Sequence, residues 1–237
     1  MTDAYRDWYR GRRVMITGGL GFIGSNLARQ LADLSADVLV IDSLLPDYGG
    51  NLFNVAGYES RLQVNVGDVR QQSAMDFLVR GREVIFNMAG QVSHIDSMTD
   101  PVTELEINCR GQLTLLEACR HHNRDAKIVY AGTRQVYGRP ASLVDACLRA
   151  GATDTVNGAA LNVGGAQPIS HRDLVQLLIQ VGGSGSVRYV EWPEEKKATT
   201  KFSASVGWSP RVSLEDGLRR SVDYYRAHLP YYLEAGA

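Results

Sequence analysis

The chain contains 237 residues, of which 44% are hydrophobic and 22% are charged, and its formal net charge is -1. Such a composition is typical of a soluble globular protein with room for one large α/β domain, or for a domain with a smaller appendage. The balanced charge disfavours nucleic acid or an anionic membrane as a partner, and no segment reaches the roughly 20 apolar residues of a membrane span.

The cysteines and the amino terminus predict a cytoplasmic protein. Cys109, Cys119 and Cys147 are odd in number and have no C-x-x-C spacing, so neither a disulfide framework nor a metal site is expected. Residues 1–13 are rich in Arg and Asp and contain no apolar core of the kind that targeting segments have. A reducing compartment fits both observations.

Strands and helices are predicted to alternate through the first 131 residues. An apolar run at 14–17 leads into a glycine cluster, after which leucines recur at helical spacing. Four more strands are predicted at 37–42, 61–68, 83–87 and 127–131, with a long helix over 101–122 before the last of them. This alternation predicts a doubly wound α/β fold, in which helices cover both faces of a parallel sheet.

After Pro140 the sequence changes character. A helix is predicted over 143–150, a short strand over 160–163, a helix capped by Ser170, and a further strand over 188–192. Ser213 and Asp216 form a capping-box-like pair ahead of a final amphipathic helix. We therefore expect one domain over 1–140 and a smaller C-terminal portion over 141–237, which partly returns to the sheet and partly forms a substrate side.

The glycine cluster has the spacing of a dinucleotide turn. In G-x-x-G-x-x-G at Gly18, Gly21 and Gly24, the missing side chains let a pyrophosphate approach the amino end of the next helix. Asp42 ends the following strand 18 residues later, where a carboxylate can accept hydrogen bonds from an adenosine ribose. The alternative for the three glycines is a tight turn that binds no cofactor, and the alternative for Asp42 is a helix or loop cap. Since no arginine stands in 43–45 to bind a 2′-phosphate, NAD is favoured over NADP.

Several further motifs follow in order. They are VIDSL at 40–44, GDVR at 67–70, NMAG at 87–90, GTRQVYG at 132–138, LNVGG at 161–165, PIS at 168–170 and GWSPRVSLEDGL at 207–218. Together with TGGLGFIGSNL at 17–27, they resemble the extended short-chain dehydrogenase/reductase family, specifically its NAD-dependent nucleotide-sugar epimerases and dehydratases. The resemblance covers nearly the whole chain and implies a Rossmann-type sheet.

The resemblance also implies roles for individual residues. It places Asp68 and Val69 beside the adenine, Ala89 and Gly90 on the nicotinamide side, and Asn108 on the long helix beneath the active site. The full set expected to contact NAD is Gly18, Gly21, Phe22, Ile23, Gly24, Asp42, Ser43, Asp68, Val69, Ala89, Gly90 and Asn108. Gln91, Ser93, His94 and Ser97 are expected on the substrate side, on the loop after the fourth strand.

The expected reaction oxidises a nucleotide sugar transiently and then returns the hydride, which requires a base and a hydroxyl donor. Thr133 matches the family's Ser/Thr donor. The family's base is a tyrosine in a Y-x-x-x-K pair, yet none of the 11 tyrosines has a lysine four residues later. Arg134 and Gln135 replace the Asp-Glu pair of related 4,6-dehydratases, which favours an epimerase over a dehydratase.

Two hypotheses remain open from the sequence. In the first, the protein is a nucleotide-sugar epimerase, and segments are missing near 140/141 and 198/199, including the helix with the tyrosine-lysine pair. In the second, it is a degenerate NAD-binding protein without catalysis, either regulatory or a remnant. The family forms homodimers through two long helices per subunit, of which only that over 101–122 is recognisable here.

Overall fold

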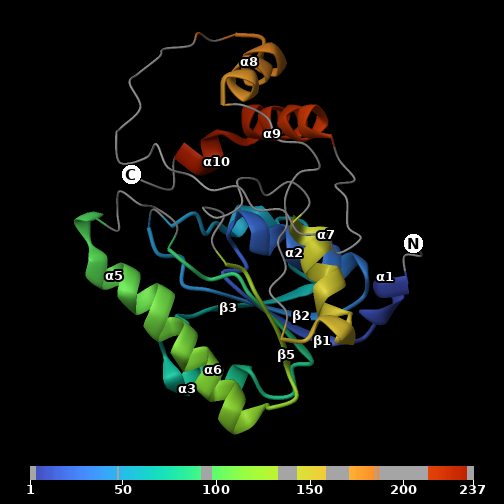
Figure 1. The fold of residues 1–237 in the computed structure, drawn as a ribbon, viewed down its shortest axis with the longest axis vertical. Helices are drawn as coiled ribbons and strands as arrows, with labels where there is room; N and C mark the ends of the chain where they lie inside the picture. The colour runs from blue at the N-terminus through green and yellow to red at the C-terminus, as the bar shows by residue number, and fades with distance from the viewer. Residues whose placement is uncertain are drawn as a thin grey trace. The chain divides into compact units, whose positions relative to one another are not determined.

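The computed structural model describes residues 4–46, 48–91, 98–132, 143–158, 171–184, 186 and 213–233 (Figure 1). Five parallel strands form one sheet in the order β3-β2-β1-β4-β5. Their bounds are β1 Arg13–Thr17, β2 Asp37–Asp42, β3 Leu62–Val66, β4 Val84–Asn87 and β5 Lys127–Tyr130. The predicted doubly wound sheet is confirmed, and its five strands lie within a residue or two of the expected ranges.

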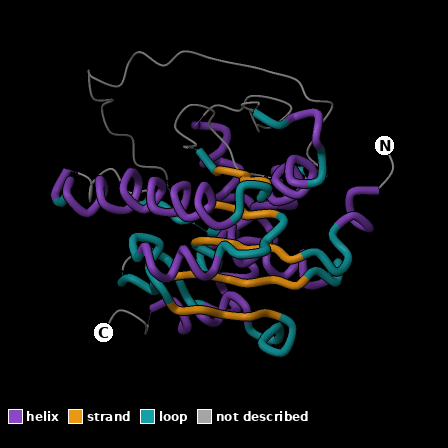
Figure 2. Tube along the Cα trace, turned by 90° about the horizontal axis from the view of Figure 1, so that it is seen from below, coloured by secondary structure: helices purple, strands orange, loops and turns teal. Residues whose placement is uncertain are grey.

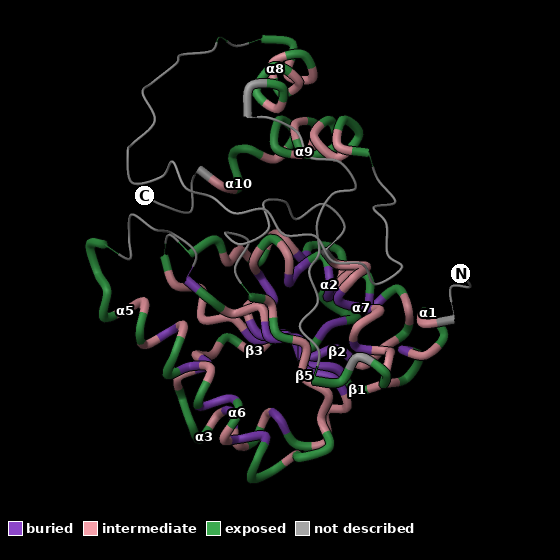
Figure 3. Tube along the Cα trace, in the orientation of Figure 1, coloured by how far each residue is buried: buried purple, intermediate pink, exposed green. Residues whose placement is uncertain are grey.

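Helices cover both faces of this sheet. Figures 1 and 2 show α3 (Gln72–Leu78) and α6 (Gly111–His122) on one side, and α2 (Phe22–Asp33) on the other. Residues that alternate along the central strand reach opposite faces. Met15 joins a buried cluster with Met75 of α3 and Leu115 of α6. Figure 3 shows that burial is concentrated in the strands and in the inward sides of these helices.

A short amino-terminal helix, which the sequence pattern did not indicate, helps to anchor a later one. Tyr9 follows α1 (Ala4–Trp8), is completely buried, and donates a 2.6 Å hydrogen bond to the carbonyl of Leu148 in α7 (Leu143–Gly151). Gly151 at the end of α7 comes so close that a Cβ there would lie 3.1 Å from Phe86 of β4. These contacts attach the carboxyl half of α7 to the sheet.

The long helix expected over 101–122 is present but is not uniform. Asp100 caps α5 (Pro101–Leu105), and a π-helical turn at Glu106–Arg110 connects it to α6. The predicted helix is therefore continuous over 101–122, and the sequence pattern did not indicate its π-helical turn. A π turn adds one residue to a single turn, and the apolar period of the flanking segments does not reveal it.

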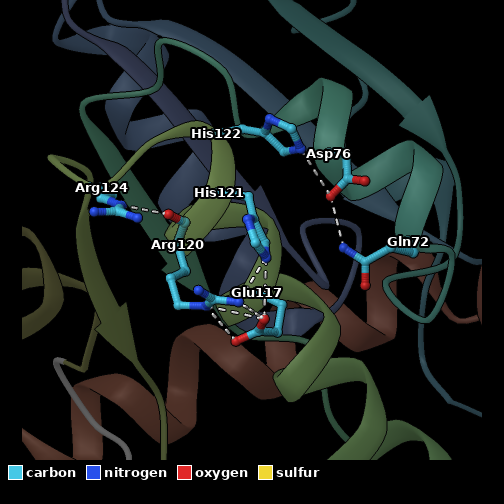
Figure 4. Close-up of polar contacts among 7 residues, drawn as sticks. All are labelled: Gln72, Asp76, Glu117, Arg120, His121, His122 and Arg124. Carbon is cyan, nitrogen blue, oxygen red and sulfur yellow. Dashed lines mark hydrogen bonds and ion pairs between the residues drawn. The ribbon is translucent and has the colours of Figure 1, made fainter.

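The carboxyl end of α6 carries Arg120, His121 and His122. The charge of Arg120 is favourable there, near the negative end of the helix dipole. In Figure 4, His121 Nε2 lies 3.5 Å from a Glu117 oxygen, and His122 Nε2 lies 3.5 Å from a carboxylate oxygen of Asp76 in α3. Both histidines immediately precede the turn into β5. The His122 contact connects α6 to α3, whereas the His121 contact stays within α6.

The described residues fall into two compact units. One contains the chain up to Gly132 together with Cys147–Asn157, which includes the short turn Asp154–Val156. The other contains α8 (His171–Gly182), α9 (Leu214–His228) and α10 (Pro230–Leu233). The predicted boundary at 140/141 stays a prediction, and the strands predicted over 160–163 and 188–192 lie outside the described residues. None of the described helices has the length and apolar character needed to cross a bilayer.

The capping pair predicted before the last long helix is confirmed. The Ser213 hydroxyl oxygen accepts a 3.1 Å hydrogen bond from the backbone N–H of Asp216, and the hydroxyl donates a 2.7 Å hydrogen bond to the Asp216 carboxylate. These bonds satisfy a backbone donor that the first turn of α9 would otherwise leave unpaired. A local pattern of four residues therefore determines where α9 begins.

Candidate dinucleotide site

The glycine turn between β1 and α2 is built from close backbone approaches. Gly18 has φ +62°, and a Cβ there would lie 2.8 Å from the backbone of Ala89. A Cβ at Gly24 would overlap the Gly18 carbonyl oxygen and lie 2.7 Å from the Cα of Gly19. Gly18 therefore lets the turn pass close to the loop after β4, and Gly24 lets α2 begin close to the turn. This is the arrangement that presents a helix amino end to a phosphate group.

The middle glycine differs from its two neighbours. Gly21 is the N-cap residue of α2 and has ordinary extended dihedral angles, φ -74° and ψ 176°. Its Cβ would meet nothing closer than the Gly18 carbonyl oxygen at 3.3 Å. Folding therefore tolerates a side chain at Gly21 better than at Gly24. Phe22, the next residue and an expected cofactor contact, is 62% exposed, and Ile23 is half-buried.

Asp42 connects the end of β2 to the glycine turn. One carboxylate oxygen accepts a 3.0 Å hydrogen bond from the backbone N–H of Leu20, and the other accepts a 3.0 Å bond from that of Leu44. Leu44 has φ +49°, which is uncommon for a residue other than glycine. Each carboxylate oxygen can accept a second hydrogen bond. Asp42 therefore supports the turn and retains acceptor capacity for a ribose, with Ser43 half-buried beside it.

Two asparagines after β2 also hold the turn, and the sequence analysis missed both. The carbonyl of Leu20 accepts a 2.6 Å bond from the Asn54 side-chain amide and a 3.1 Å bond from the backbone N–H of Asn51. The segment that follows β2 thus holds the Leu20 carbonyl, and Asp42 at the end of β2 holds the Leu20 N–H. An asparagine in a loop carries no sequence signal for such a contact, because its partner lies 34 residues away.

The carboxyl ends of β1 and β4 meet at the point where the strand order reverses, which is where open α/β sheets bind ligands. Thr17 Oγ1 donates a 2.7 Å bond to Asn87 Oδ1 and accepts a 3.2 Å bond from the backbone N–H of Ala89. Gln112 on α6 hydrogen bonds to the Asn87 amide and donates a 3.1 Å bond to the Ala89 carbonyl. The predicted nicotinamide-side residue Ala89 is therefore held by two polar side chains, those of Thr17 and Gln112, and Asn87 connects these two.

Asn108 acts on the same loop from the π-helical turn. Its Oδ1 accepts a 2.8 Å bond from the Gln91 N–H, and its Nδ2 donates a 3.0 Å bond to the Gln91 carbonyl. A Cβ at Gly90 would lie 3.3 Å from Asn108 Oδ1, so the loop passes close to this amide. Gln91 itself is 7% exposed. The pairing supports a positioning role for Asn108, because it holds the backbone of two predicted site residues, Gly90 and Gln91.

Asp68 and Val69 were predicted to flank an adenine, and their side chains have other partners in this structure. Arg70 donates to both Asp68 oxygens at 2.5–3.0 Å. This hydrogen bonding holds the pKa of Asp68 below its ordinary value, against a smaller raising effect of burial. Val69 belongs to the buried cluster, and a Cβ on Gly111 would lie 2.9 Å from its side chain. Contacts of these two residues with an adenine stay a prediction.

The remaining expected site residues belong to segments outside the described part of the chain. Ser93, His94 and Ser97, expected on the substrate side, lie outside the described residues, as do Thr133, Arg134 and Gln135. The structure therefore brings together the glycine turn, Asp42, Asn87–Gln91 and Asn108 at the carboxyl ends of the strands. The predicted hydroxyl donor, Thr133, is not among the residues described at this edge.

Comparisons with known proteins agree with this geometry. Residues 14–158 match the model of the NAD dependent epimerase/dehydratase family. CDP-paratose 2-epimerase of Salmonella typhi is 34% identical over 128 residues, and a dTDP-glucose 4,6-dehydratase of Mycolicibacterium smegmatis is 33% identical over 130. Each alignment covers 53% of this chain and 38% of the relative, so the chain spans about two fifths of the length of these curated proteins.

Solved structures share the fold at low sequence identity. The epimerase Mth375 of Methanothermobacter thermautotrophicus has a TM-score of 0.80 at 17% identity, with 96% of each chain covered. The Bordetella bronchiseptica enzyme WbmF, solved in complex with NAD+ and UDP, has a TM-score of 0.78 at 18% identity, with 97% of each chain covered. At these identities the likeness demonstrates the fold of this chain.

Proposed function

Because the chain belongs to the NAD-dependent epimerase/dehydratase family, we propose that the carboxyl edge of its sheet binds NAD and serves a redox rearrangement of a nucleotide sugar. The observation that carries the proposal is the glycine cradle. A Cβ at Gly18 or Gly24 would overlap neighbouring backbone, so the turn keeps an uncovered amino end of α2. This end suits a pyrophosphate, and Asp42 at the end of β2 suits a ribose. The residues present fit the cofactor.

The preferred reaction is an epimerisation. NAD, when bound, supplies the hydride acceptor for the sugar alcohol and then the donor for the resulting ketone. This chain's own residues would hold the sugar against the loop after β4, whose backbone Asn108 and Gln112 fix. In the proposal Thr133 donates a hydrogen bond to the developing oxyanion. Arg134 and Gln135 offer no acid pair for elimination of water, which disfavours the 4,6-dehydratase alternative.

Binding of NAD is tested by calorimetric titration with NAD and with NADP. We expect NAD to bind more tightly, and Asp42→Ala to weaken it by about 1.5 to 3 kcal/mol through loss of a charge-assisted hydrogen bond. Asp33→Ala is the matched control, because Asp33 is also acidic but lies 51% exposed at the other end of α2. Because Asp42 also supports the turn, each variant's Tm is measured alongside. Tighter NADP binding, or equal losses in both variants, would contradict the proposal.

A second candidate function, NAD binding without catalysis, is favoured by one observation. No tyrosine of the 237 residues is followed by lysine four positions later. We therefore expect these residues to show no epimerase turnover with UDP-, dTDP- or GDP-sugars, since a missing general base costs about 10² to 10⁴ in rate. Turnover abolished by His94→Ala would refute this expectation and assign His94 as the base.

The two functions are separated by the intact mass of the protein in its source. The chain has a mass of 26.0 kDa. A protein well above this mass supports an epimerase whose Y-x-x-x-K helix lies in segments missing near 140/141 and 198/199. A protein of equal mass supports the non-catalytic function. The domain boundary proposed at 140/141 and the substrate role of the C-terminal portion depend on the same result.

The outer face of the long helix supports a proposal about assembly. Val102, Leu105, Cys109, Leu113 and Leu116 recur at helical spacing and are all exposed, Leu113 by 61% and Leu116 by 50%. An apolar stripe of this length favours a homodimer or another partner over a monomer. Light scattering tests this, and Leu113→Gln with Leu116→Gln should shift the mass toward the monomer. A well-behaved monomer before substitution would contradict the proposal.

A further inference from the structure

A second concave site lies at the opposite edge of the sheet from the glycine turn. It is a cavity of about 350 Å³ lined by the residues that begin β1 and β5, by the segment just before β4, and by Trp8 of α1. Four of the lining side chains are cations, namely Arg12, Arg13, Arg82 and Lys127, and three are carboxylates, namely Glu83, Asp125 and Asp154. In parallel sheets this amino edge is not where the cofactor binds. The cavity is therefore separate from the proposed NAD site.

Two of the four cations form ion pairs with carboxylates of the protein. Arg12 Nη1 lies 2.5 Å from a Glu83 carboxylate oxygen, and its guanidinium stacks 3.8 Å from the centre of the Trp8 ring. Lys127 Nζ lies 2.6 Å from an Asp154 oxygen. Within each pair the two opposite charges neutralise each other, and the four side chains form part of the cavity wall. The charged lining groups outside these two pairs are Arg13, Arg82 and the Asp125 carboxylate, so the cavity retains a net positive charge.

Two nitrogens of the Arg82 guanidinium group are buried without hydrogen-bond partners. Its side chain is 15% exposed, and neither Nε nor Nη1 finds an acceptor among the described residues. The nearest carboxylate, that of Asp37, lies 3.8 Å from Nη1, which is too far for a hydrogen bond. Burial lowers the pKa of Arg82, and the nearby charge of Arg13 lowers it further, while Asp37 partly offsets both effects. A buried charged donor without an acceptor is costly.

Arg13 lies beside Arg82 because Gly81 leaves room for it. A Cβ on Gly81 would come within 2.7 Å of Arg13 Nη1, and Gly81 has φ +67°. Within the part of the chain that the structure describes, no carboxylate pairs with the Arg13 guanidinium. Two guanidinium groups, one from the start of β1 and one from the segment before β4, therefore converge on one cavity, and like charges so placed repel each other. An anion between them would offset the repulsion and would supply the acceptor that Arg82 lacks.

We propose that this cavity binds the phosphate group of a small phosphorylated molecule between Arg13 and Arg82. Guanidinium groups that approach from two separate segments suit a tetrahedral anion, which offers oxygens in several directions, better than a planar carboxylate. No hydrogen bond holds Arg82 Nε or Nη1, so the group can turn toward the anion without losing one. The cavity has room for more than the phosphate itself, which fits a metabolite rather than the free ion.

The test measures Tm as a function of inorganic phosphate, with ionic strength held constant by chloride. We expect a saturable rise in Tm that survives saturating NAD, because NAD would fill the glycine turn and leave this cavity open. Arg13→Gln and Arg82→Gln should each need about ten- to a hundredfold more phosphate for the same rise, from loss of a charge-assisted bond. Arg124→Gln is the matched control, since Arg124 is exposed near the cavity but does not line it.

Three outcomes would overturn the proposal. The first is a phosphate effect that persists unchanged in Arg13→Gln and Arg82→Gln, and the second is one that NAD abolishes, because both place the anion elsewhere. The third is that succinate, a dicarboxylate, raises the Tm as much as phosphate does, which would refute the assignment to a phosphate group. Arg13 is exposed, so Arg13→Gln keeps the test valid if Arg82→Gln does not fold. Failure of NAD to bind leaves the dependence on the two arginines intact and refutes only the proposed function.

Discussion

Replacement of Gly24 by alanine should damage the fold and the cofactor site together. The added Cβ would overlap the Gly18 carbonyl oxygen and lie 2.9 Å from the Gly18 carbonyl carbon and 2.7 Å from Gly19 Cα. All three atoms are backbone, so no side chain can rotate away. Either α2 or the turn must shift by about 1 Å to restore ordinary contact distances.

The expected magnitude follows from what the shift disturbs. Overpacking a tight site costs about 1 to 3 kcal/mol, and for a chain of this size that lowers Tm by about 2 to 12 °C. The turn also carries the Leu20 peptide, which Asp42 and Asn54 hold by hydrogen bonds of 3.0 and 2.6 Å. A shift of α2 therefore moves the proposed pyrophosphate and ribose positions relative to each other.

Gly21→Ala provides the matched comparison. Its Cβ would lie 3.3 Å from the Gly18 carbonyl oxygen, and Gly21 has ordinary dihedral angles. We expect Gly21→Ala to leave Tm nearly unchanged and still to weaken NAD, because its methyl group would point where a pyrophosphate approaches. Gly24→Ala should lower both Tm and NAD affinity. Thermal unfolding by circular dichroism and calorimetric titration with NAD give the two readouts.

The reasoning would be refuted by a Gly24→Ala protein with the Tm of the unmodified chain. That result would mean that the contact between α2 and the turn is not close. Equal Tm losses in the two variants would also contradict it, because the argument rests on the difference between backbone overlap at one glycine and ordinary contact at the other. Loss of NAD binding alone in Gly24→Ala would leave the cofactor site supported and the packing argument wrong.

Two further predictions concern titratable groups. Hydrogen bonding from Arg70 lowers the pKa of Asp68, so this pair stabilises the fold above the ordinary value of 3.8 and the stability is lost as pH falls through the lowered pKa. Arg70→Ala should therefore raise the pH of acid unfolding, and an unchanged midpoint would contradict the pairing. Burial raises the pKa of Cys119 to about 11 and of Cys147 to about 12, whereas Cys109 is exposed. Alkylation of the native protein at neutral pH should modify Cys109 alone by mass spectrometry, and labelling of the buried pair would refute it.

Local patterns were enough to predict the sheet and the glycine turn. Apolar runs such as 37–42 and the glycine spacing at 18–24 are contiguous in the chain, and each has few physical solutions. The parallel direction of the strands could be predicted because helices separate them along the chain, and such strand–helix–strand connections are right-handed. The position of Asp42 could likewise be predicted, since the carboxyl ends of parallel strands meet at one edge.

Contacts between distant residues were decided only by tertiary structure. Asp42 meets the Leu20 N–H across 22 residues, and Asn108 meets Gln91 from a π-helical turn that apolar periodicity does not reveal. The convergence of Arg13 and Arg82 at the amino edge depends on strands that begin 71 residues apart. A side chain's type limits what it can bind, but its partner is set by packing that brings remote backbone within about 3 Å, and no local sequence pattern encodes that distance.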